Sequence, residues 1–336
     1  MKSKKTIIIA EVGVNHNGKI NLAKKLIKEA ALSGADYVKF QTYITESLVT
    51  KFAKKANYQK HKSRNNETQF NMLKKFQLSY FDHKELIKCC KQNSIKFLSS
   101  PFDQKSIDLL LTLKLKTLKI PSGEITNLPY LEYIGKFSKF IILSTGMSNL
   151  NEVKRAVKIL NKSGTPLNKI SILHCTSSYP TEMKDVNLKA ILTLKKATRL
   201  KVGYSDHTKG IEVAIAAKIL GAEIIEKHLT LDKKMKGPDH KASVEPEEFK
   251  LMVNSIRNIE SALGDGRKIA KKNELTNKLV VRKSIVAATD INRGEKFTKK
   301  NTTIKRPGCG ISPMFIKKLI GKSAKKSFKK DQLISI

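Results

Sequence analysis

The strongest constraint on the fold is a regular alternation of short β-branched segments and helical patterns over the first 265 residues. Amphipathic helical patterns, such as those over 21–33, 149–163, 209–220 and 246–263, fill the gaps between the apolar segments. Eight such units in about 265 residues match a (β/α)₈ TIM barrel in number and length, so an α/β fold is expected. The expected strands are 6–11, 37–41, 95–100, 117–120, 140–144, 170–175, 201–204 and 223–228.

A doubly wound sheet is the alternative fold. It usually has fewer strands and a glycine-rich first turn, whereas residues 13–18 read GVNHNG and lack the GxGxxG pattern. One connection is long, from 42 to about 81, with one expected helix at 68–76. Because a loop after the second strand lies on the catalytic face of a barrel, this segment is a candidate lid.

The strand–helix pattern stops near 264–266. Residues 268–278 are polar, and from 282 onward short strands and turns replace it, with a short helix at 313–320. We therefore expect a catalytic barrel at 1–265, a linker at 266–281 and a small, mostly β domain at 282–336. The small domain carries 15 basic and 3 acidic side chains, so it is the more basic part by density.

Composition excludes several classes of protein. Hydrophobic residues make up 40% of the 336, which is enough for a core, and no apolar run reaches 18 residues. The apolar run near the N-terminus is too short for a signal peptide, so the expectation is a cytoplasmic protein with no membrane partner. Four cysteines without a CxxC pair argue against a disulfide framework or a thiolate zinc site.

The net charge of +37 raises the question of a nucleic-acid partner. Only 8 of the 66 basic residues are arginine, and the lysines are spread over nearly every segment. Aromatic residues are 6% and tryptophan is absent, so a stacking platform for bases is poorly supplied. No nucleic-acid partner is expected, and the charge indicates a lysine-biased solvated surface.

Polar side chains stand at the end of every expected strand, where a barrel collects its functional groups. This predicts one large, charged active site. The residues at these ends include Glu11, Lys39, Gln41, Ser100, Asp103, Lys119, Ser122, Glu124, Ser144, His174, Ser177, Ser205, His207, Glu226 and His228.

Three serines at strand ends, Ser122, Ser144 and Ser205, suit a phosphate. Hydroxyls donate to phosphate oxygens, and Lys39 and Lys119 supply positive charge. A single serine in such a place is more often a turn or cap residue. The convergence of several on one face is what favours the phosphate site.

Two histidines, His207 and His228, stand at adjacent strand ends. Two neutral imidazoles make a borderline metal site with positions left for substrate oxygens, whereas a lone histidine is more often structural. His174 is the competing ligand. In the loop 237–243, Asp239 either holds sugar hydroxyls or caps a turn locally.

At this point the motifs resemble one family over nearly the whole chain, the sialic acid synthases. The tail KRPG at 305–308 resembles the antifreeze-like (SAF) domain that ends these enzymes. The matching stretches are AEVGVNHNG at 10–18, VKFQT at 38–42, KIPSGE at 119–124, LSTGM at 143–147, LHCT at 173–176, GYSDH at 203–207, EKH at 226–228 and GPDH at 237–240.

The resemblance implies an enzyme, a carbon–carbon bond-forming transferase that condenses phosphoenolpyruvate with an N-acetylated amino sugar. The expected reaction is that of N-acetylneuraminate synthase, which uses N-acetylmannosamine and releases phosphate by C–O cleavage. The alternative is N,N'-diacetyllegionaminate synthase, which uses a 2,4-diacetamido-2,4,6-trideoxy-mannose. The implied cofactor is a divalent metal, Mn²⁺ first, with Mg²⁺ or Co²⁺ as alternatives, and the implied assembly is a domain-swapped homodimer.

The matching motifs also imply roles for individual residues. His207 and His228 would hold the metal, and Arg306 would reach the sugar's N-acetyl group from a partner subunit. The catalytic residues would be Glu11, Lys39 and Glu124, with Glu11 as a base beside the reacting carbons. Two positions depart from the family's pattern. The family often has asparagine where this chain has Ser177, and again where it has Cys309 after the Arg-Pro-Gly motif. Phosphoenolpyruvate would contact Lys39, Lys119, Ser122, Ser144 and Ser205, and the sugar would contact Gln41, Glu124, Ser177, Tyr179 and Asp239.

Two functions of other classes remain open. One is a Schiff-base aldolase, for which Lys39 or Lys119 would be the nucleophile, because strand alternation turns Lys227 away from Glu226 and His228. Trapping with borohydride and pyruvate would decide it. The other is a nucleic-acid or surface-binding module built on the basic tail, which filter binding at physiological salt would test.

Overall fold

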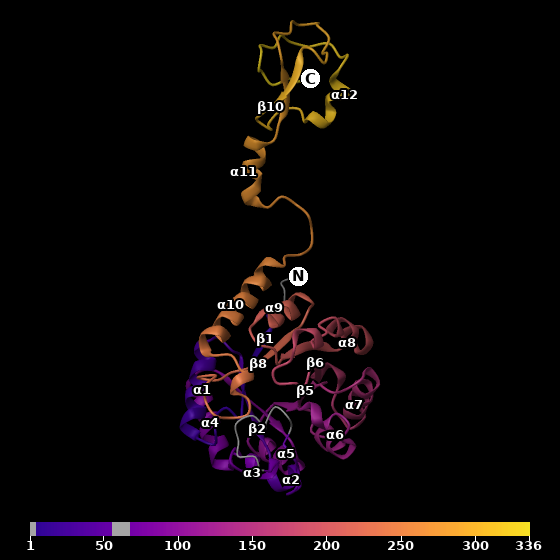
Figure 1. The fold of residues 1–336 in the computed structure, drawn as a ribbon. Coiled ribbons are helices and arrows are strands. Elements are labelled where there is room, and N and C mark those ends of the chain that lie inside the picture. The colour runs from indigo at the N-terminus through magenta and orange to yellow at the C-terminus, as the bar shows by residue number, and fades with distance from the viewer. Residues whose placement is uncertain (1–4, 56–67) are drawn as a thin grey trace. The chain divides into compact units, whose positions relative to one another are not determined.

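The structure is a computed structural model that describes residues 5–55 and 68–336. The chain divides into two compact units, Met1–Asp265 and Gly266–Ile336 (Figure 1). The first contains the eight expected strands and their helices, and the second is small. Each unit has its own apolar core.

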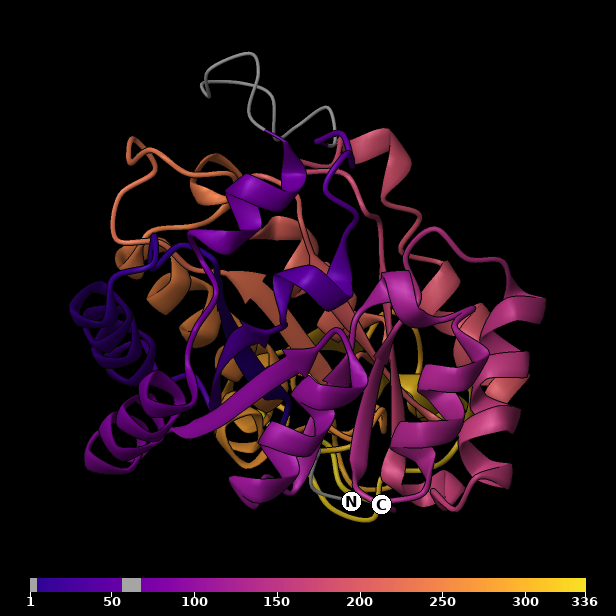
Figure 2. The same cartoon turned by 90° about the horizontal axis from the view of Figure 1, so that it is seen from below.

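The first unit is a parallel barrel, which confirms the expected fold class (Figure 2). Within the described residues its ladder runs in the order β3-β2-β1-β8-β7-β6-β5-β4, so that β3 and β4 end the ladder. The observed strands begin and end within two residues of the expected ones. They are β1 Ile7–Gly13, β2 Tyr37–Thr42, β3 Lys96–Pro101, β4 Thr117–Ile120, β5 Phe140–Ser144, β6 Ile170–Cys175, β7 Lys201–Asp206 and β8 Ile224–His228.

The register of three neighbouring strands already assembles part of a site. Glu11 on β1 is paired with Lys39 on β2 and with His228 on β8. Because parallel strands in a barrel share one carboxyl end, these three residues reach the same face of the molecule.

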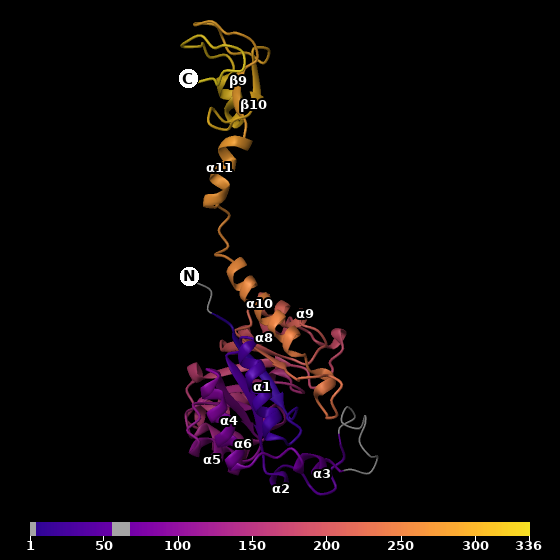
Figure 3. The ribbon, with the colours of Figure 1, turned by 90° about the vertical axis from the view of Figure 1, so that its left-hand side faces the viewer.

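Helices cover the outside of the barrel, and α1 and α4 lie side by side there (Figure 3). In α7 the buried residues Val153, Ala156, Val157 and Leu160 recur at helical spacing, and a capping box at Asn149 starts the helix. The helices are α1 Ile20–Leu32, α2 Thr45–Leu48, α3 Gln69–Lys74, α4 Tyr80–Gln92, α5 Gln104–Thr112, α6 Leu128–Gly135, α7 Leu150–Lys162, α8 Ala190–Thr198, α9 Glu212–Ile219 and α10 Pro246–Ala262.

The barrel interior has its own small apolar cluster, separate from the core between strands and helices. Each of its five fully or nearly buried members comes from a different strand, and each stands two residues before a polar strand-end residue. This cluster, called here the apolar layer, consists of Ile9, Leu98, Ile142, Leu173 and Ile224. It is the floor beneath the charged strand ends.

The second unit packs its apolar residues around two antiparallel strands. The segment that the sequence assigns to a polar linker contains a helix, α11. None of its residues is buried, so helix propensity and a capping box at its start, and not packing, account for it. The elements are α11 Lys272–Val281, β9 Ser284–Ala287, β10 Thr302–Lys305, a 3₁₀ turn Pro313–Phe315 and α12 Ile316–Leu319. No helix among the described residues is long and apolar enough to cross a membrane.

Candidate active site

A cavity of ≈ 450 Å³ opens at the carboxyl ends of the barrel strands. It brings together most of the polar residues expected there from the sequence. Those that line it are Glu11, Lys39, Gln41, Ser100, Lys119, Ser122, Ser144, Ser177, Tyr179, Ser205, His207, Glu226, His228 and Asp239. This cavity is called the cleft below.

At the base of the cleft, two lysines and two carboxylates are buried together. The Nζ of Lys119 donates to both carboxylate oxygens of Glu226, at 3.0 and 2.9 Å. Lys39 lies 3.3 Å from Glu226 and 3.2 Å from Glu11. Ser205 donates to Glu226 at 2.9 Å. The four charged groups therefore balance one another at the base of the cleft.

Burial and charge shift the pKa values of these groups in different directions. Burial raises the pKa of Glu11 to about 7, although Lys39 opposes it. Burial also acts to raise the pKa of Glu226, but Lys119 and Lys39 outweigh it and hold that pKa below its usual range. Burial lowers the pKa of Lys119, whereas the two carboxylates outweigh burial and raise the pKa of Lys39. Glu226 is therefore the fixed anion of this group and Glu11 the adaptable one.

Serine hydroxyls surround this base. The Oγ of Ser122 accepts a hydrogen bond from the backbone N–H of Gly146 at 3.0 Å. A Cβ at position 146 would stand 2.3 Å from the Oγ of Ser177 and 2.8 Å from that of Ser122, so only glycine lets the loops approach this closely. Ser144 and Ser205 are buried on the neighbouring strands.

The two histidines at adjacent strand ends face each other, with ring centroids 5.5 Å apart. Nδ1 of His207 donates to the carbonyl of Thr176 at 2.7 Å, which leaves its Nε2 with a lone pair. Nδ1 of His228 is buried without a hydrogen-bond partner. Burial lowers the pKa of His207 to about 4 and lowers that of His228 further, so both rings are neutral.

Neutral imidazoles with an unassigned ring nitrogen fit a divalent metal. Among the described residues, no group of three or more His, Cys, Asp or Glu side chains could hold one. The residues present therefore fit a site with two protein ligands and several open positions, which substrate or water oxygens would complete.

Tyr179 and Asp239 also line the cleft. The ring of Tyr179 stacks 4.2 Å from that of His207, measured between centroids. The loop that carries Asp239 is fixed because Ser243 donates to the Asp239 carbonyl at 2.7 Å and Asn15 donates to Ser243 at 2.8 Å. Burial raises the pKa of Asp239 to about 6.

The long connection after β2 also reaches the cleft. Leu48 and Val49, at the end of α2, and Gln69 and Leu73, in α3, are among its lining residues. The part of the expected lid at 56–67 lies outside the described residues.

Two features of the site were not anticipated from the sequence in the form observed. Strand alternation placed Glu226 on the same face as His228, but it did not predict that Glu226 would contact both Lys119 and Lys39. Lys227 turns away from the cleft as expected, but it is fully buried and donates to Asp206 at 2.8 Å. This ion pair joins the two strands immediately beside His207 and His228.

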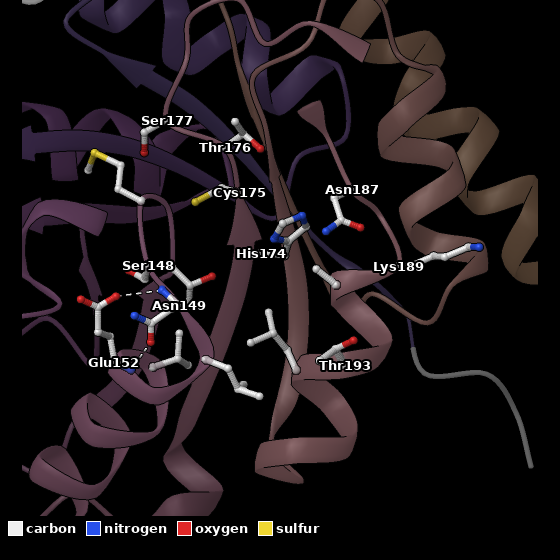
Figure 4. Close-up of a pocket in the computed structure, with 16 residues that line it drawn as sticks. Ser148, Asn149, Glu152, His174, Cys175, Thr176, Ser177, Asn187, Lys189 and Thr193 are labelled. Atoms are coloured by element: carbon white, nitrogen blue, oxygen red, sulfur yellow. Dashed lines mark hydrogen bonds between the residues drawn. The ribbon is translucent and has the colours of Figure 1, made fainter. Parts of the chain in front are cut away.

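The competing ligand His174 faces elsewhere. It lines a neighbouring cavity of ≈ 840 Å³ between α7 and α8 (Figure 4), and its Nε2 is 2.8 Å from the Val186 carbonyl. The two cavities share Met147, Cys175 and Ser177. Strand alternation explains the difference, because Cys175 and His174 point to opposite sides of β6.

Within the barrel unit, Glu124 is not among the residues that line the cleft. Glu124 lies in the 3₁₀ turn Ser122–Glu124, and its carboxylate accepts a hydrogen bond from Asn127 at 2.6 Å. Its expected contact with the sugar stays a prediction. Arg306 follows β10 in the second unit, where it is exposed.

The comparisons with known proteins show the family to which the chain belongs. The model of the NeuB family matches residues 26–268, and that of the SAF domain matches residues 282–336. The chain is 55% identical to N,N'-diacetyllegionaminic acid synthase of Campylobacter jejuni, covering 98% of this chain and 99% of that protein. It is 48% identical to the synthase of the same name from Legionella pneumophila, over 94% and 89% of the two chains.

A solved structure agrees as well. The N-acetylneuraminic acid synthetase of Leptospira borgpetersenii, crystallised with citrate, superposes with a TM-score of 0.71 at 35% identity, covering 82% of this chain and 90% of that one. The family model and the full-length relatives show that the chain is an enzyme of the NeuB family, the synthases of sialic acids and related sugar acids, with a C-terminal SAF domain.

Proposed function

We propose that the enzyme condenses phosphoenolpyruvate with 2,4-diacetamido-2,4,6-trideoxy-mannose and releases phosphate, forming N,N'-diacetyllegionaminate. The sequence by itself favours N-acetylmannosamine as the sugar. The 55% identity to a diacetyllegionaminic acid synthase over 99% of its length, against 35% to the N-acetylneuraminic acid synthetase, favours the diacetamido sugar instead.

The arrangement that carries the reaction is the cluster of lysines and serines at the base of the cleft. Lys39 and Lys119 are buried in the cleft that Ser122 and Ser144 also line, so a phosphate placed there would meet two cations and two hydroxyl donors, and Ser205 would become a third if it turned away from Glu226. The hydroxyls and charges are already oriented by their neighbours. This preorganisation favours the binding of phosphoenolpyruvate and the departure of its phosphate.

The chemistry divides among the remaining groups. The methylene carbon of phosphoenolpyruvate forms a bond to the aldehyde carbon of the open-chain sugar, and the aldehyde oxygen takes up a proton to become a hydroxyl. Water then adds to the former enol carbon, and Glu11 is positioned to accept the proton of that water. The C–O bond to phosphate breaks last, and the resulting carbonyl completes the product.

The open face of the cleft suits the sugar. Gln41, Tyr179 and Asp239 supply an amide, a hydroxyl and a carboxylate around one side of it. His207 and His228 would hold a divalent metal, Mn²⁺ in our proposal, which when bound supplies a Lewis acid for the sugar's carbonyl oxygen. Glu124 is left out of the proposed contacts, because it does not line the cleft.

The sugar assignment is tested by phosphate release with each sugar, with mass spectrometry of the product. We expect kcat/KM to be at least about tenfold higher with the diacetamido sugar, since a buried polar contact that finds no partner costs about one factor of ten or more. Equal rates, or a preference for N-acetylmannosamine, would contradict the assignment while leaving the reaction class intact.

The bond that breaks is tested separately with phosphoenolpyruvate carrying ¹⁸O at the bridging position. C–O cleavage delivers the label to the released phosphate. A label found in the sugar acid would mean P–O cleavage and would contradict the addition of water to the enol carbon.

A further inference from the structure

The opposite end of the barrel contains a larger cavity that the proposed reaction does not use. Its volume is ≈ 910 Å³, within the usual range for small-molecule sites. It lies among the first residues of the barrel strands, below the apolar layer, and Ile142 and Ile224 belong to both. It is called the lower cavity here.

Part of the wall of the lower cavity is apolar, because eight of its 23 lining residues are isoleucine or leucine and three are aromatic. Ile87 and Ile95 contribute from the α4–β3 region, and Leu113 and Leu115 from the α5–β4 connection. At its edge Phe140 is 52% exposed, an apolar surface left open to water. A patch of this kind at the mouth of a concave site marks a place where an apolar group can bind.

The rim of the same cavity is strongly basic. Seven of its lining residues are lysines and one, Glu223, is acidic, whereas the whole chain has 66 basic and 29 acidic residues. At the ratio of the whole chain, eight charged residues would include two or three acids, so this rim is somewhat more basic than the chain as a whole. The lysines are Lys5, Lys91, Lys96, Lys114, Lys116, Lys169 and Lys201.

Three of these lysines are engaged by neighbours. Lys5 pairs with Asp36 at 3.2 Å, Lys96 lies over the ring of Tyr37, and Lys169 donates to the Ser138 carbonyl at 2.9 Å. In the described part of the chain, the other four have no hydrogen-bond or ion-pair partner for the side chain. They are Lys91, Lys114, Lys116 and Lys201.

Charge excludes the protein itself as the occupant. Residues 1–4 have only basic charged side chains, and the C-terminal domain carries 15 basic and 3 acidic residues. A second copy of the chain has a net charge of +37. None of these complements a rim of unpaired lysines, so the occupant is another molecule, with an anionic group and an apolar body.

We propose that the lower cavity binds a single-chain fatty-acid carboxylate, with its aliphatic chain against the isoleucines and leucines and its carboxylate among Lys114, Lys116 and Lys201. Inorganic phosphate would leave the apolar walls unfilled, and a neutral alkyl chain would leave the lysines unpaired. This site is independent of the proposed reaction, and a failure of either leaves the other standing.

Isothermal titration of the full-length enzyme with hexanoate, octanoate and decanoate, below their micelle concentrations, tests the aliphatic part. We expect affinity to rise by up to about fourfold for each added methylene, as burial of the chain requires. Decanol, which has the chain without the charge, should bind more weakly than decanoate. A flat series, or decanol binding as tightly as decanoate, would overturn the proposal.

Charge reversal tests the location. The triple variant Lys114→Glu, Lys116→Glu, Lys201→Glu should weaken decanoate binding by at least about tenfold. The matched control is Lys25→Glu, Lys158→Glu, Lys196→Glu, which makes the same change in net charge with exposed lysines on α1, α7 and α8. Equal affinity of the two triple variants would contradict the site.

A second pair of variants tests the apolar wall without altering charge. Phe140→Ala should weaken decanoate binding severalfold, while Phe81→Ala, which removes a ring that is 75% exposed on α4, should not. All four variants should release phosphate at the wild-type rate without decanoate, which establishes that they fold. Weakened binding in Phe81→Ala but not in Phe140→Ala would place the site elsewhere and end the proposal.

Discussion

Lys119 and Glu226 form a buried two-oxygen ion pair at the base of the cleft, with Lys39 3.3 Å from the same carboxylate. Glu226 therefore contacts both cations where a phosphate is proposed to bind, and Glu11 contacts one of them, Lys39, at 3.2 Å. Removing Glu226 would leave excess positive charge in a dry site, which is unfavourable in the free enzyme. The pair explains how a cleft can be charged for phosphate and still fold without it.

Glu226→Gln should lower the free energy of unfolding by about 3 kcal/mol, because it breaks a buried ion pair and leaves its partner charged. Added inorganic phosphate should restore part of that loss, since it can compensate Lys39 and Lys119. Denaturant unfolding with and without phosphate measures both effects. Glu182→Gln, at an exposed residue, is the control and should change neither value.

Lys227→Met should destabilise the enzyme by about 3–5 kcal/mol, because Asp206 would keep a buried charge without its partner. Combining it with Asp206→Asn should recover part of the loss. The ion pair lies beside the proposed metal ligands, so Mn²⁺ affinity of the folded single variant should also fall. Unfolding curves and electron paramagnetic resonance titration give the two readouts, and strictly additive single losses would argue against coupling.

Asp239→Asn should stabilise the enzyme at neutral pH. Burial raises the pKa of Asp239 from 3.8 to about 6, so its contribution to stability is fully present below pH 3.8 and is lost as pH rises through 6. The variant lacks this loss, and its advantage should grow between pH 4 and pH 7 to roughly 3 kcal/mol at most. An advantage that is constant with pH would contradict a buried carboxylate.

The same variant should bind the sugar poorly. In the wild type, KM for the sugar should fall as pH rises through 6 and Asp239 ionises, because a carboxylate accepts hydrogen bonds from sugar hydroxyls better than its protonated form does. In Asp239→Asn that dependence should disappear while KM for phosphoenolpyruvate stays near its wild-type value. Initial rates at several pH values measure all of these.

Removal of divalent metal with EDTA should abolish turnover, and Mn²⁺ should restore it. His207→Ala and His228→Ala should each lose nearly all activity and bind Mn²⁺ much more weakly, because a two-ligand site reduced to one holds metal poorly. His174→Ala faces the other cavity and is the control. Full turnover by a metal-stripped enzyme would contradict the proposed role of the metal.

The expected role of Arg306 in a partner subunit predicts complementation. In a swapped heterodimer of Arg306→Ala and His228→Ala chains, an intact barrel would be combined with an intact tail. About half of randomly paired dimers are hybrids, so activity should recover to roughly a quarter of the wild-type value. Mass spectrometry would verify that hybrids form, and inactive hybrids would leave Arg306 acting in its own chain or only structural.

The sequence predicts the barrel well because its signals are local. Strand periodicity placed β4, β5 and β6 with their observed bounds. Strand alternation also put Glu226 and His228 on one face, yet the partners of Glu226 lie 107 and 187 positions earlier in the chain, and no local pattern reveals them. The motif around Glu124 predicts a sugar contact but not the 3₁₀ turn or the hydrogen bond from Asn127 that the structure shows, and the sugar contact itself stays a prediction.

The apolar layer formed by Ile9, Leu98, Ile142, Leu173 and Ile224 makes the cleft a blind passage. Whatever enters from the carboxyl ends of the strands must leave by the same way. In the proposed reaction, substrates and products all pass through this one opening. The molecule that binds deeper in the cleft therefore has to bind first and leave last. An ordered kinetic mechanism is thus a consequence of five aliphatic side chains that touch no substrate.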